Sequence, residues 1–463
     1  MAWDLPGSRA AQNLQLSILD AETYLRTQTA RPAWILGTLH LSVKDRRARL
    51  RSRTFARIFP YRIIPSILNS QAAKALAMKS KSHIAVIGAG AFGGWTALHL
   101  LERGALVTLL DAWGPGNSRA SSGGETRIMR GTYGPDQPYT DLAARALKLW
   151  PKYEQRWKKQ FLHRIGVLWM VSSRDDAYER GSLDVLREAR MKFQELSTPE
   201  MKKHWPQINF EDVRWGIFEP ECGYLDARAS CQAVVDAFVS GGGTYRQLAV
   251  SPEGLEGGDL RSLRLSDGSR LRADYYVFAC GPWMGKLFPE SLGSVIRPTK
   301  QDIFFFGTPA GDSRFTDPHL PVWGDHGKRF FYGIPGNDRR GLKVADDTRG
   351  GAFDPTNGER VVSQATLKRV RDYIAFRFPE MKDAPLVETR VCQYEQTSDS
   401  NFIVDRHPRM DNVWLLGGGS GHGFKHGPAL GEMMAELILK DGEPNTVWRL
   451  SRFAEHPRPR VRP

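Results

Sequence analysis

The chain has 463 residues, a formal net charge of +14, and ordinary fractions of hydrophobic (41%) and charged (25%) residues. These values are typical of a folded, water-soluble protein that is long enough for two domains. No apolar run in the sequence reaches the ~18–20 residues that cross a bilayer, so we expect no membrane partner.

The positive charge is concentrated near the start of the chain. Residues 1–77 contain twelve basic and four acidic residues, a net charge of +8, which leaves +6 for the other 386 residues. The rest of the chain is only mildly basic, so we expect no nucleic-acid partner. We interpret residues 1–77 as a basic extension, either disordered or an upstream mistranslation, because Met78 stands just before the first predicted strand. A mitochondrial presequence is a further alternative.

The segment from Ile84 to Asp111 predicts a strand, a Gly-rich turn, an apolar helix and a second strand that ends in an acid. In this pattern the first glycine permits the tight turn, the second lets backbone N–H groups approach a pyrophosphate, and the third lets helix and strand pack closely. The phosphates then lie at the helix N-terminus, and the acid is placed to bind ribose hydroxyls. The sequence therefore predicts a dinucleotide site at Gly88, Gly90, Ala91, Phe92, Gly93 and Asp111.

Further elements follow from hydrophobic periodicity and turn residues. Up to the middle of the chain, the sequence predicts a Gly-rich connection at 114–131, an amphipathic helix at 139–158, an alternating strand at 163–171 and a helix at 177–196. It then predicts a strand and turn at 216–225, a helix at 231–241, a strand at 244–250, a hairpin at 263–271 and a buried strand at 275–279. We expect the last of these strands to return to the cofactor sheet.

Residues 297–385 are mostly β in pattern, with one long helix at 364–378, and indicate a separate sheet domain. A buried strand at 413–416 then enters a second Gly-rich turn at 417–423, and a helix begins near Pro428. An NAD enzyme has no need for this second turn. FAD is longer, and its isoalloxazine ring needs another set of backbone donors, so the pattern favours FAD.

Four motifs, in order along the chain, resemble the monomeric sarcosine oxidase and N-methyltryptophan oxidase family. They are the segment 121–130, the GLK at 341–343, the VCQY at 391–394 and the SGHGFK at 420–425. The family belongs to the D-amino-acid-oxidase-like FAD-dependent oxidoreductases. The resemblance implies an α/β fold in which a glutathione-reductase-type, Rossmann-like FAD-binding domain carries an inserted substrate domain (α+β) with a mixed or antiparallel sheet.

This resemblance suggests how the chain is divided. We expect a discontinuous FAD-binding domain made of residues 78–162, 222–296 and 386–442. Residues 163–221 and 297–385 would form the substrate-binding domain, and residues 443–463 a C-terminal tail. The family also implies a monomer.

The resemblance assigns roles to several residues around the expected site. Arg130 and Lys425 would bind the carboxylate of an amino acid, because arginine suits two-pronged recognition of a carboxylate. Lys343 would place a positive charge near flavin N5, where it favours the reaction with O2. Tyr332 would form a pocket wall, and His422 would contact the flavin or the substrate, or only cap the turn. The remaining cofactor contacts would come from Ser121, Thr126, Arg127, Gly418, Ser420, Gly421, Gly423 and again Lys425.

Cys392 is the expected point of covalent attachment. In the family, a cysteine at this position bonds through sulfur to the 8α-methyl carbon of FAD, and a cationic neighbourhood would favour the thiolate that this chemistry needs. The other three cysteines, Cys222, Cys231 and Cys280, we interpret as structural. The four show no metal-ligand spacing and no C-x-x-C pair, so we expect no metal and no disulfide. A reducing compartment, the cytoplasm, is then the default.

The chain departs from the family pattern at two places. The family commonly has a His-His-Gly-Asp-Thr-Arg run where this chain has Ser122-Gly123-Gly124-Glu125-Thr126-Arg127, so a histidine linked to flavin attachment is missing. A histidine often lies four residues after the lysine of GLK, where this chain has Asp347. An acid at that pocket edge could favour a substrate with a second positive charge, or it could point away.

We therefore expect a FAD-dependent oxidase that converts an N-methylated or other secondary α-amino acid to an imine and reduces O2 to H2O2. Related alternatives are an oxidase of pipecolate or fructosyl amino acids, or a dehydrogenase that passes electrons to a carrier. An RNA-modifying flavoprotein is an alternative of another class, suggested only by the basic extension. A non-catalytic flavin-binding scaffold is the third.

Overall fold

The computed structural model describes residues 82–255, 258–336 and 340–454. The basic extension predicted for residues 1–77 lies outside these residues, and so does the end of the predicted tail from residue 455 onward. Everything below concerns the described residues.

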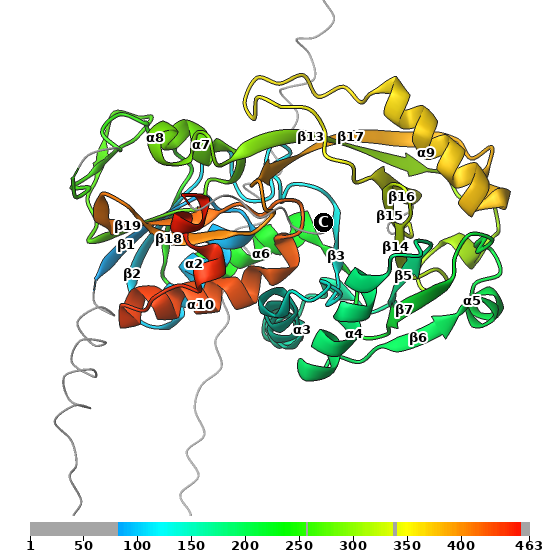
Figure 1. The fold of residues 1–463 in the computed structure, drawn as a ribbon. Coiled ribbons are helices and arrows are strands. Elements are labelled where there is room, and N and C mark those ends of the chain that lie inside the picture. Colours follow the sequence, from blue (N-terminus) through cyan, green and yellow to red (C-terminus); the bar gives the residue numbers. More distant parts are fainter. Residues whose placement is uncertain (1–81, 256–257, 337–339, 455–463) are drawn as a thin grey trace, which may run out of the picture. The chain divides into compact units, whose positions relative to one another are not determined.

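A six-stranded sheet brings together segments from both ends of the described chain (Figure 1). Its strand order is β18-β19-β12-β1-β2-β9, and β1 is parallel to both β2 and β12, while β19 is parallel to β12. The strands are β1 (His83–Ile87), β2 (Leu106–Leu110), β9 (Thr244–Arg246), β12 (Tyr275–Phe278), β18 (Ile403–His407) and β19 (Met410–Gly417). The predicted return of residues 275–279 to the cofactor sheet is confirmed, and the predicted strand at 413–416 pairs beside it as part of β19.

Helices pack against this sheet and against one another, namely α2 (Ala91–Glu102), α3 (Gln137–Trp157), α6 (Ala227–Ser240) and α10 (Gly427–Lys440). Helices α2 and α10 cross closely at Gly431, where a Cβ would lie only 2.6 Å from the backbone of Trp95. A Cβ on Gly423 would likewise lie 2.6 Å from the ring of Phe92. This contact places the C-terminal Gly-rich turn beside the N-terminal one.

The second large sheet has eight strands in the order β17-β13-β16-β15-β14-β5-β7-β6. Its pairs are antiparallel except for β14 and β5, and helix α9 (Gln364–Arg377) packs against β16. The strands are β5 (Val167–Val171), β6 (Gln194–Ser197), β7 (Trp215–Glu219), β13 (Arg297–Phe306), β14 (Val322–His326), β15 (Phe330–Ile334), β16 (Leu342–Asp346) and β17 (Leu386–Gln396). The expected α/β fold with an additional mixed sheet is confirmed.

The domain boundaries stay a prediction. Strand β17 pairs along its length with β13 in the eight-stranded sheet, although the boundaries place residues 386–396 in the cofactor domain. Figure 1 shows these two long strands running side by side from the neighbourhood of the six-stranded sheet toward the other sheet.

Smaller elements complete the described chain. A three-stranded sheet contains β3 (Thr126–Met129), β8 (Gly223–Asp226) and β4 (Leu162–His163), and the predicted hairpin is formed by β10 (Leu263–Arg264) and β11 (Arg270–Leu271). Short helices are α4 (Ala177–Glu188), α5 (Thr198–His204), α7 (Met284–Leu287) and α8 (Pro289–Leu292). The 3-10 turns are η1 (Gly281–Trp283), η2 (Ser313–Phe315), η3 (Pro379–Met381), η4 (Phe424–His426), η5 (Thr446–Trp448) and η6 (Leu450–Phe453).

Three predicted elements differ from the structure. The predicted helix at 177–196 ends at Glu188, because Arg190 adopts a left-handed conformation (φ 57°) and Leu196 then pairs with Gly216 in the eight-stranded sheet. The connection predicted at 114–131 contains strand β3, whose partner β8 lies about 100 residues later and gives no local signal. The strand predicted at 244–250 ends at Arg246.

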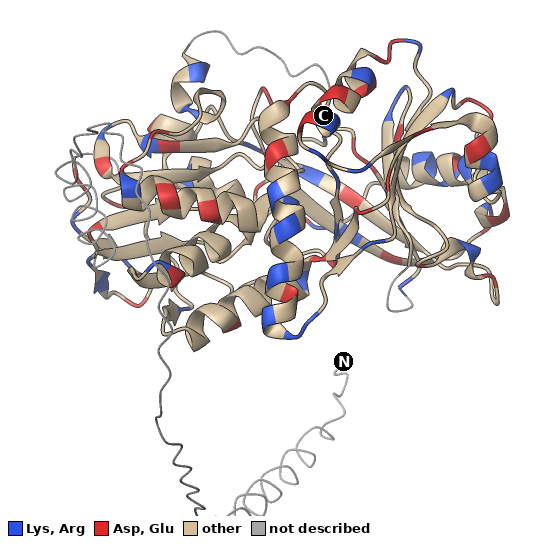
Figure 2. Cartoon of the chain, turned by 90° about the horizontal axis from the view of Figure 1, so that it is seen from below, with Lys and Arg blue, Asp and Glu red and all other residues tan. Residues whose placement is uncertain are grey.

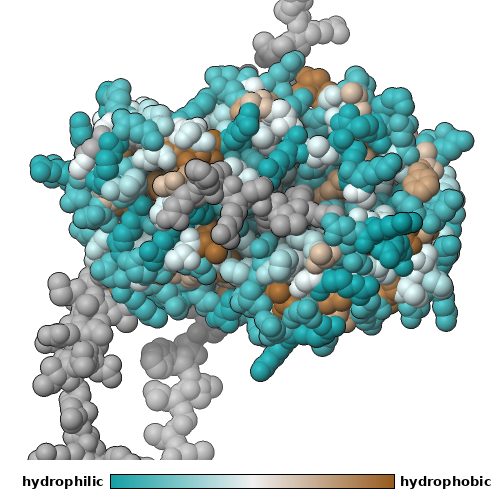
Figure 3. All heavy atoms as spheres, in the orientation of Figure 1, coloured by the Kyte–Doolittle hydropathy of each residue, from teal (hydrophilic) through white to brown (hydrophobic). Residues whose placement is uncertain are grey.

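Basic and acidic residues are interspersed along the helices and loops seen from below in Figure 2. On the face in Figure 3, hydrophobic residues lie in small separate groups among hydrophilic ones. Among the described residues, no helix combines the length and the hydropathy needed to cross a bilayer.

Candidate functional site

A cavity of about 330 Å³ lies where the two Gly-rich turns meet. Its wall contains Gly88, Gly90, Ala91, Phe92, Asp111 and Ser121 from the N-terminal part, and Gly419, Gly421 and Gly423 from the C-terminal turn. We call this space the cofactor cavity. It therefore joins the two segments that the sequence suggested would meet around one ligand.

The first turn has the backbone geometry that its glycines predict. Gly88 has φ +105°, and a Cβ there would lie 2.3 Å from the carbonyl oxygen of Ala279. A Cβ on Gly93 would lie 1.9 Å from the carbonyl oxygen of Gly88, so this position holds helix α2 close to strand β1. Gly90 is the N-cap of α2 and offers no side chain to cap it. The N-terminus of α2 is therefore suited to bind an anion.

We expect Gly93→Ala to weaken both the fold and cofactor binding. The added methyl group has no room beside the Gly88 carbonyl, so the turn must shift, and such overpacking costs about 1–3 kcal/mol of unfolding free energy. Urea unfolding and the amount of flavin retained after gel filtration measure the effect. Gly351→Ala is the matched control, because a Cβ there meets no atom within 4 Å. Equal stability and equal flavin content of the two variants would contradict this role of Gly93.

Asp111 lies at the cofactor cavity with its carboxylate held by backbone donors. Its Oδ2 accepts the N–H of Ala89 at 2.8 Å, and its Oδ1 accepts those of Trp113 and Gly114 at 2.9 and 2.8 Å. Burial raises the pKa of this carboxyl, against the effect of the three N–H groups. A carboxylate has about four lone-pair sites, so acceptor capacity remains for ribose hydroxyls.

The C-terminal turn is built from unusual backbone conformations. Gly418 and Gly421 have φ values of +69° and +85°, and Ser420 between them has φ 46°. Gly418 donates its N–H to Oε2 of Glu395 at 3.1 Å, and Ser420 Oγ donates to the Gly418 carbonyl at 2.9 Å. Glu395 also lines the cofactor cavity, and burial raises the pKa of its carboxyl to about 7 despite the N–H groups of Gly419 and Gly418.

These features together fit FAD. The uncapped helix N-terminus suits the pyrophosphate, Asp111 suits a ribose, and the glycine backbone of the second turn leaves room for a flat ring system. Gly93 and Gly418 shape the two turns without lining the cavity.

A second, smaller cavity of about 80 Å³ adjoins the first, and we call it the substrate cavity. Arg127, Tyr394, Gly421 and Phe424 line both. The structure brings to this one cavity all seven side chains for which the sequence suggested a catalytic or flavin-linking role, together with Ser420, a predicted cofactor contact. They are Arg127, Arg130, Tyr332, Lys343, Cys392, Ser420, His422 and Lys425.

Arg130 and Lys425 are joined by Tyr133. The guanidinium carbon of Arg130 lies 4.2 Å from the centroid of the Tyr133 ring, and Lys425 Nζ donates to the Tyr133 hydroxyl at 2.7 Å. Arg130 Nη1 also donates to the Thr132 carbonyl. Both basic side chains are buried, with 7% and 4% of their surface exposed, so their charges are poorly screened by water. Tyr133 was not among the predicted site residues.

Lys343 and Arg127 meet at a backbone carbonyl. Lys343 Nζ donates to the carbonyl of Thr126 at 3.0 Å, and Arg127 Nη1 donates to the same oxygen at 2.7 Å. Burial, with a smaller contribution from the charge of Arg127, lowers the pKa of the Lys343 ammonium to about 7. Thr126 lines neither cavity, so the structure places it behind these two side chains.

Cys392 lies beside Arg127. Its Sγ is 3.4 Å from Arg127 Nη2 and 3.8 Å from the carbonyl oxygen of Ser121. Because side chains alternate along a strand, Cys392, Tyr394 and Gln396 of β17 all face the substrate cavity, while Glu395 faces the cofactor cavity. Cys392 therefore lies where the two cavities adjoin, next to the positive charge of Arg127.

Tyr332 and His422 form parts of the same wall. Lys343 Nζ lies 5.9 Å from the centroid of the Tyr332 ring. His422 Nε2 is 2.9 Å from the carbonyl oxygen of Ser400, and its ring stacks on Phe402 with centroids 4.9 Å apart. His422 therefore holds the turn in place as well as lining the cavity.

Among the described residues that line the substrate cavity, Asp347 is the only acidic one. Its Oδ1 accepts the hydroxyl of Tyr394 at 2.7 Å. Burial raises the pKa of the carboxyl to about 6, while the Tyr394 hydrogen bond and the charge of Arg130 act in the opposite direction. The acid that departs from the family pattern thus faces the cavity.

Comparison with known proteins agrees with this geometry. The family model described as DAO, FAD dependent oxidoreductase, matches residues 83–437. Monomeric sarcosine oxidase of Bacillus sp. (strain B-0618) is 28% identical over 375 residues, which cover 78% of this chain and 93% of that protein. N-methyl-L-tryptophan oxidase of Salmonella heidelberg (strain SL476) is 26% identical and covered completely, over 81% of this chain.

The crystal structure of L-proline dehydrogenase from P. horikoshii has the same fold. Its TM-score is 0.71 at 22% sequence identity, and the match covers 81% of this chain and 98% of that one. The resemblance seen in the four sequence motifs is confirmed.

Proposed function

Because the chain belongs to the DAO family of FAD-dependent oxidoreductases, we propose that it is an oxidase of N-methylated or other secondary α-amino acids. FAD, when bound, accepts a hydride from the carbon next to nitrogen and passes the electrons to O2, which leaves as H2O2. The amino acid becomes an imine, which water hydrolyses to an aldehyde and an amine. We further propose that Cys392 holds the cofactor covalently.

The observation that carries this proposal is the placement of Arg130 and Lys425. The two buried cations both contact Tyr133, Arg130 through the ring and Lys425 through the hydroxyl, at the substrate cavity, which adjoins the cofactor cavity. A carboxylate bound there would hold the amino-acid carbon next to the other cavity, as hydride transfer requires. Tyr332 would limit the space on one side.

The same charges would prepare the substrate amine. Arg127, Arg130 and Lys425 disfavour another positive charge in the cavity, so they favour the uncharged amine over the ammonium form. The uncharged form has the nitrogen lone pair that assists loss of hydride from the neighbouring carbon.

We expect Arg130→Met to weaken binding of amino-acid substrates by about 10- to 100-fold, because hydrogen bonds to charged groups contribute about 1.5–3 kcal/mol. The apparent dissociation constant of N-methylglycine tests this, taken from how the rate of flavin reduction without oxygen saturates with its concentration. Binding of sarcosinamide, in which an uncharged amide replaces the carboxylate, should change little. Arg187→Met, in an exposed pair with Asp184, is the control. An equal loss for acid and amide would argue against a carboxylate site at Arg130.

A substrate panel tests the proposed reaction itself. We expect oxygen-dependent release of H2O2 with at least one N-methylated α-amino acid, and less with pipecolate or fructosyl-glycine. A preference for pipecolate or for fructosyl-glycine would instead indicate an oxidase of that substrate class. Reduction of an artificial carrier without H2O2 release would make it a dehydrogenase.

A further inference from the structure

One basic side chain of the substrate cavity has no part in the proposed reaction. The cavity is lined by the basic residues Arg127, Arg130, Lys343, Arg349 and Lys425, and by one acid, Asp347. Arg130 and Lys425 are assigned to the substrate carboxylate, Lys343 to oxygen, and Arg127 contacts Cys392. Arg349 remains. The three arginines and Lys425 carry four positive charges. An ionised Asp347 and one bound substrate carboxylate together would supply only two negative charges.

Arg349 is held in place by Ser400. Its Nη2 donates to Ser400 Oγ, which also accepts the amide of Gln396 at 3.0 Å. Ser400 is 2% exposed and has φ 60°, a left-handed conformation that is costly for a residue other than glycine. The surrounding structure must therefore stabilise this conformation at the cavity wall.

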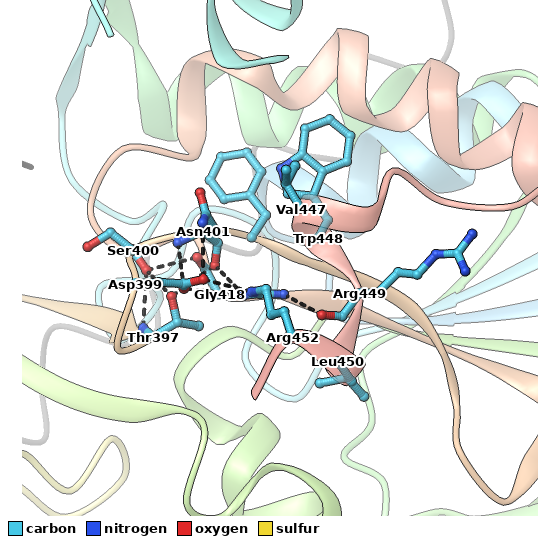
Figure 4. Close-up of polar contacts among 12 residues, drawn as sticks. Thr397, Asp399, Ser400, Asn401, Gly418, Val447, Trp448, Arg449, Leu450 and Arg452 are labelled. Atoms are coloured by element: carbon cyan, nitrogen blue, oxygen red, sulfur yellow. Dashed lines mark hydrogen bonds and ion pairs between the residues drawn. The ribbon is translucent and has the colours of Figure 1, made fainter. Parts of the chain in front are cut away.

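The C-terminal segment supplies that stabilisation. Arg452 Nε donates to Asp399 Oδ2 at 2.8 Å, and Arg452 Nη2 donates to the carbonyl of Asn401 at 3.1 Å, so one guanidinium holds both neighbours of Ser400 (Figure 4). Thr397 Oγ1 closes the loop by donating to the Asn401 carbonyl at 2.8 Å. A loop fixed in this way loses little entropy when a ligand binds to Arg349.

We propose that the substrate carries a second acidic group and that Arg349, positioned by Ser400, binds it. This inference rests on the proposed function and narrows it to dianionic amino acids, with the second carboxylate on the side chain or on the nitrogen substituent. Arginine matches the planar geometry of a carboxylate. The competing assignment, a basic substrate group bound by Asp347, would add a cation to a cavity already rich in cations.

Binding of two small acids to the FAD-loaded protein tests the inference without turnover. Glutarate has two carboxylates, and glutaramate replaces one of them by a neutral amide of the same shape. By isothermal titration calorimetry we expect glutarate to bind about 10- to 100-fold more tightly. Arg349→Gln should bring the two dissociation constants together, whereas Arg349→Lys should keep part of the difference. Arg187→Gln should retain all of it.

Equal binding of both acids to the wild-type protein, or no binding of either, overturns the inference. Turnover distinguishes this failure from that of the proposed function. We expect a higher kcat/KM for N-methylglutamate than for N-methylglutamine, and Arg349→Gln should reverse or remove the preference. A preference for N-methyllysine would assign recognition to Asp347 instead. If no N-methylated amino acid reduces the flavin, the proposed function itself is wrong.

Discussion

Lys343→Met is expected to slow the reaction of the substrate-reduced protein with O2 by about 100- to 1000-fold, the usual cost of removing one buried group that stabilises developing charge. The Lys343 side chain is 3% exposed, and its Nζ is fixed by the Thr126 carbonyl at 3.0 Å. A charge in this position is little screened by water, so it stabilises the negative charge that develops on oxygen.

Rapid mixing separates this step from the oxidation of the amine. The protein is reduced by substrate without oxygen, mixed with oxygenated buffer, and followed by flavin absorbance. The reduction step should change much less than the oxygen step. Lys368→Met is the matched control, since Lys368 is exposed and pairs with Asp372 one helical turn away. An unchanged oxygen rate in the Lys343 variant would remove this residue from the mechanism.

The pH dependence of the oxygen step follows from the same residue. Burial lowers the pKa of Lys343 to about 7, so its ammonium form is present below that pH and is lost as the pH rises through it. We therefore expect the wild-type oxygen rate constant to fall as pH rises, and the Lys343→Met profile to be flat over this range. A bound anion would move the midpoint upward without changing the direction.

Cys392→Ser is expected to change flavin attachment from complete to none. The sulfur lies 3.4 Å from Nη2 of Arg127, a residue that lines both cavities, so Cys392 stands where the two cavities meet and within reach of a flavin ring held there. After acid denaturation, wild-type precipitate should stay yellow, and the Cys392→Ser precipitate should be colourless with its flavin in the supernatant. Cys280→Ser is the control, because Cys280 lines the cofactor cavity but should remain unlinked.

Two results would contradict this prediction. Free flavin from the denatured wild-type protein would mean a non-covalent cofactor, which would leave the family assignment intact. A yellow precipitate from Cys392→Ser would place the attachment at another residue.

Features that depend on local chain geometry could be predicted from the sequence. Gly93 is required because helix α2 passes close to the carbonyl of Gly88, only five residues earlier. Gly88 is required by the tight turn itself and by the neighbouring strand β12, because Ala279, just after the end of this strand, lies beside it. The meeting of the two chain ends followed from a similar strand, turn and helix near residues 88 and 420, because parallel strands of one sheet present such turns at the same edge.

Features that depend on contacts between distant segments could not be predicted in the same way. Tyr133 joins Arg130 to Lys425 across nearly 300 residues, and nothing in its local sequence indicates that contact. Tyr394 lines both cavities whereas its neighbour Glu395 lines only the cofactor cavity, and strand alternation alone does not reveal this without knowing that both faces are buried. Ser400 was missed because its left-handed backbone depends on Arg452 and the C-terminal segment.

The departure at Asp347 shows the same limit for charge. From sequence, this acid could equally select a positive substrate group or point away. In the structure the Asp347 side chain faces the cavity, and its Oδ1 accepts the Tyr394 hydroxyl. Arg349 lines the same cavity. The net charge of the cavity depends on all of its side chains together, so one residue does not determine which substrate charge the cavity prefers.

We propose that this chain holds a flavin which takes a hydride from an amino acid fixed by Arg130 and Lys425. The most direct measurement is an anaerobic titration of the purified yellow protein with N-methylated α-amino acids, followed by its visible absorbance. We predict loss of the oxidised flavin spectrum with at least one of them, and Arg130→Met should need a much higher concentration of it to reach the same rate of reduction. A flavin that dithionite reduces, but that no N-methylated amino acid reduces, would contradict the account.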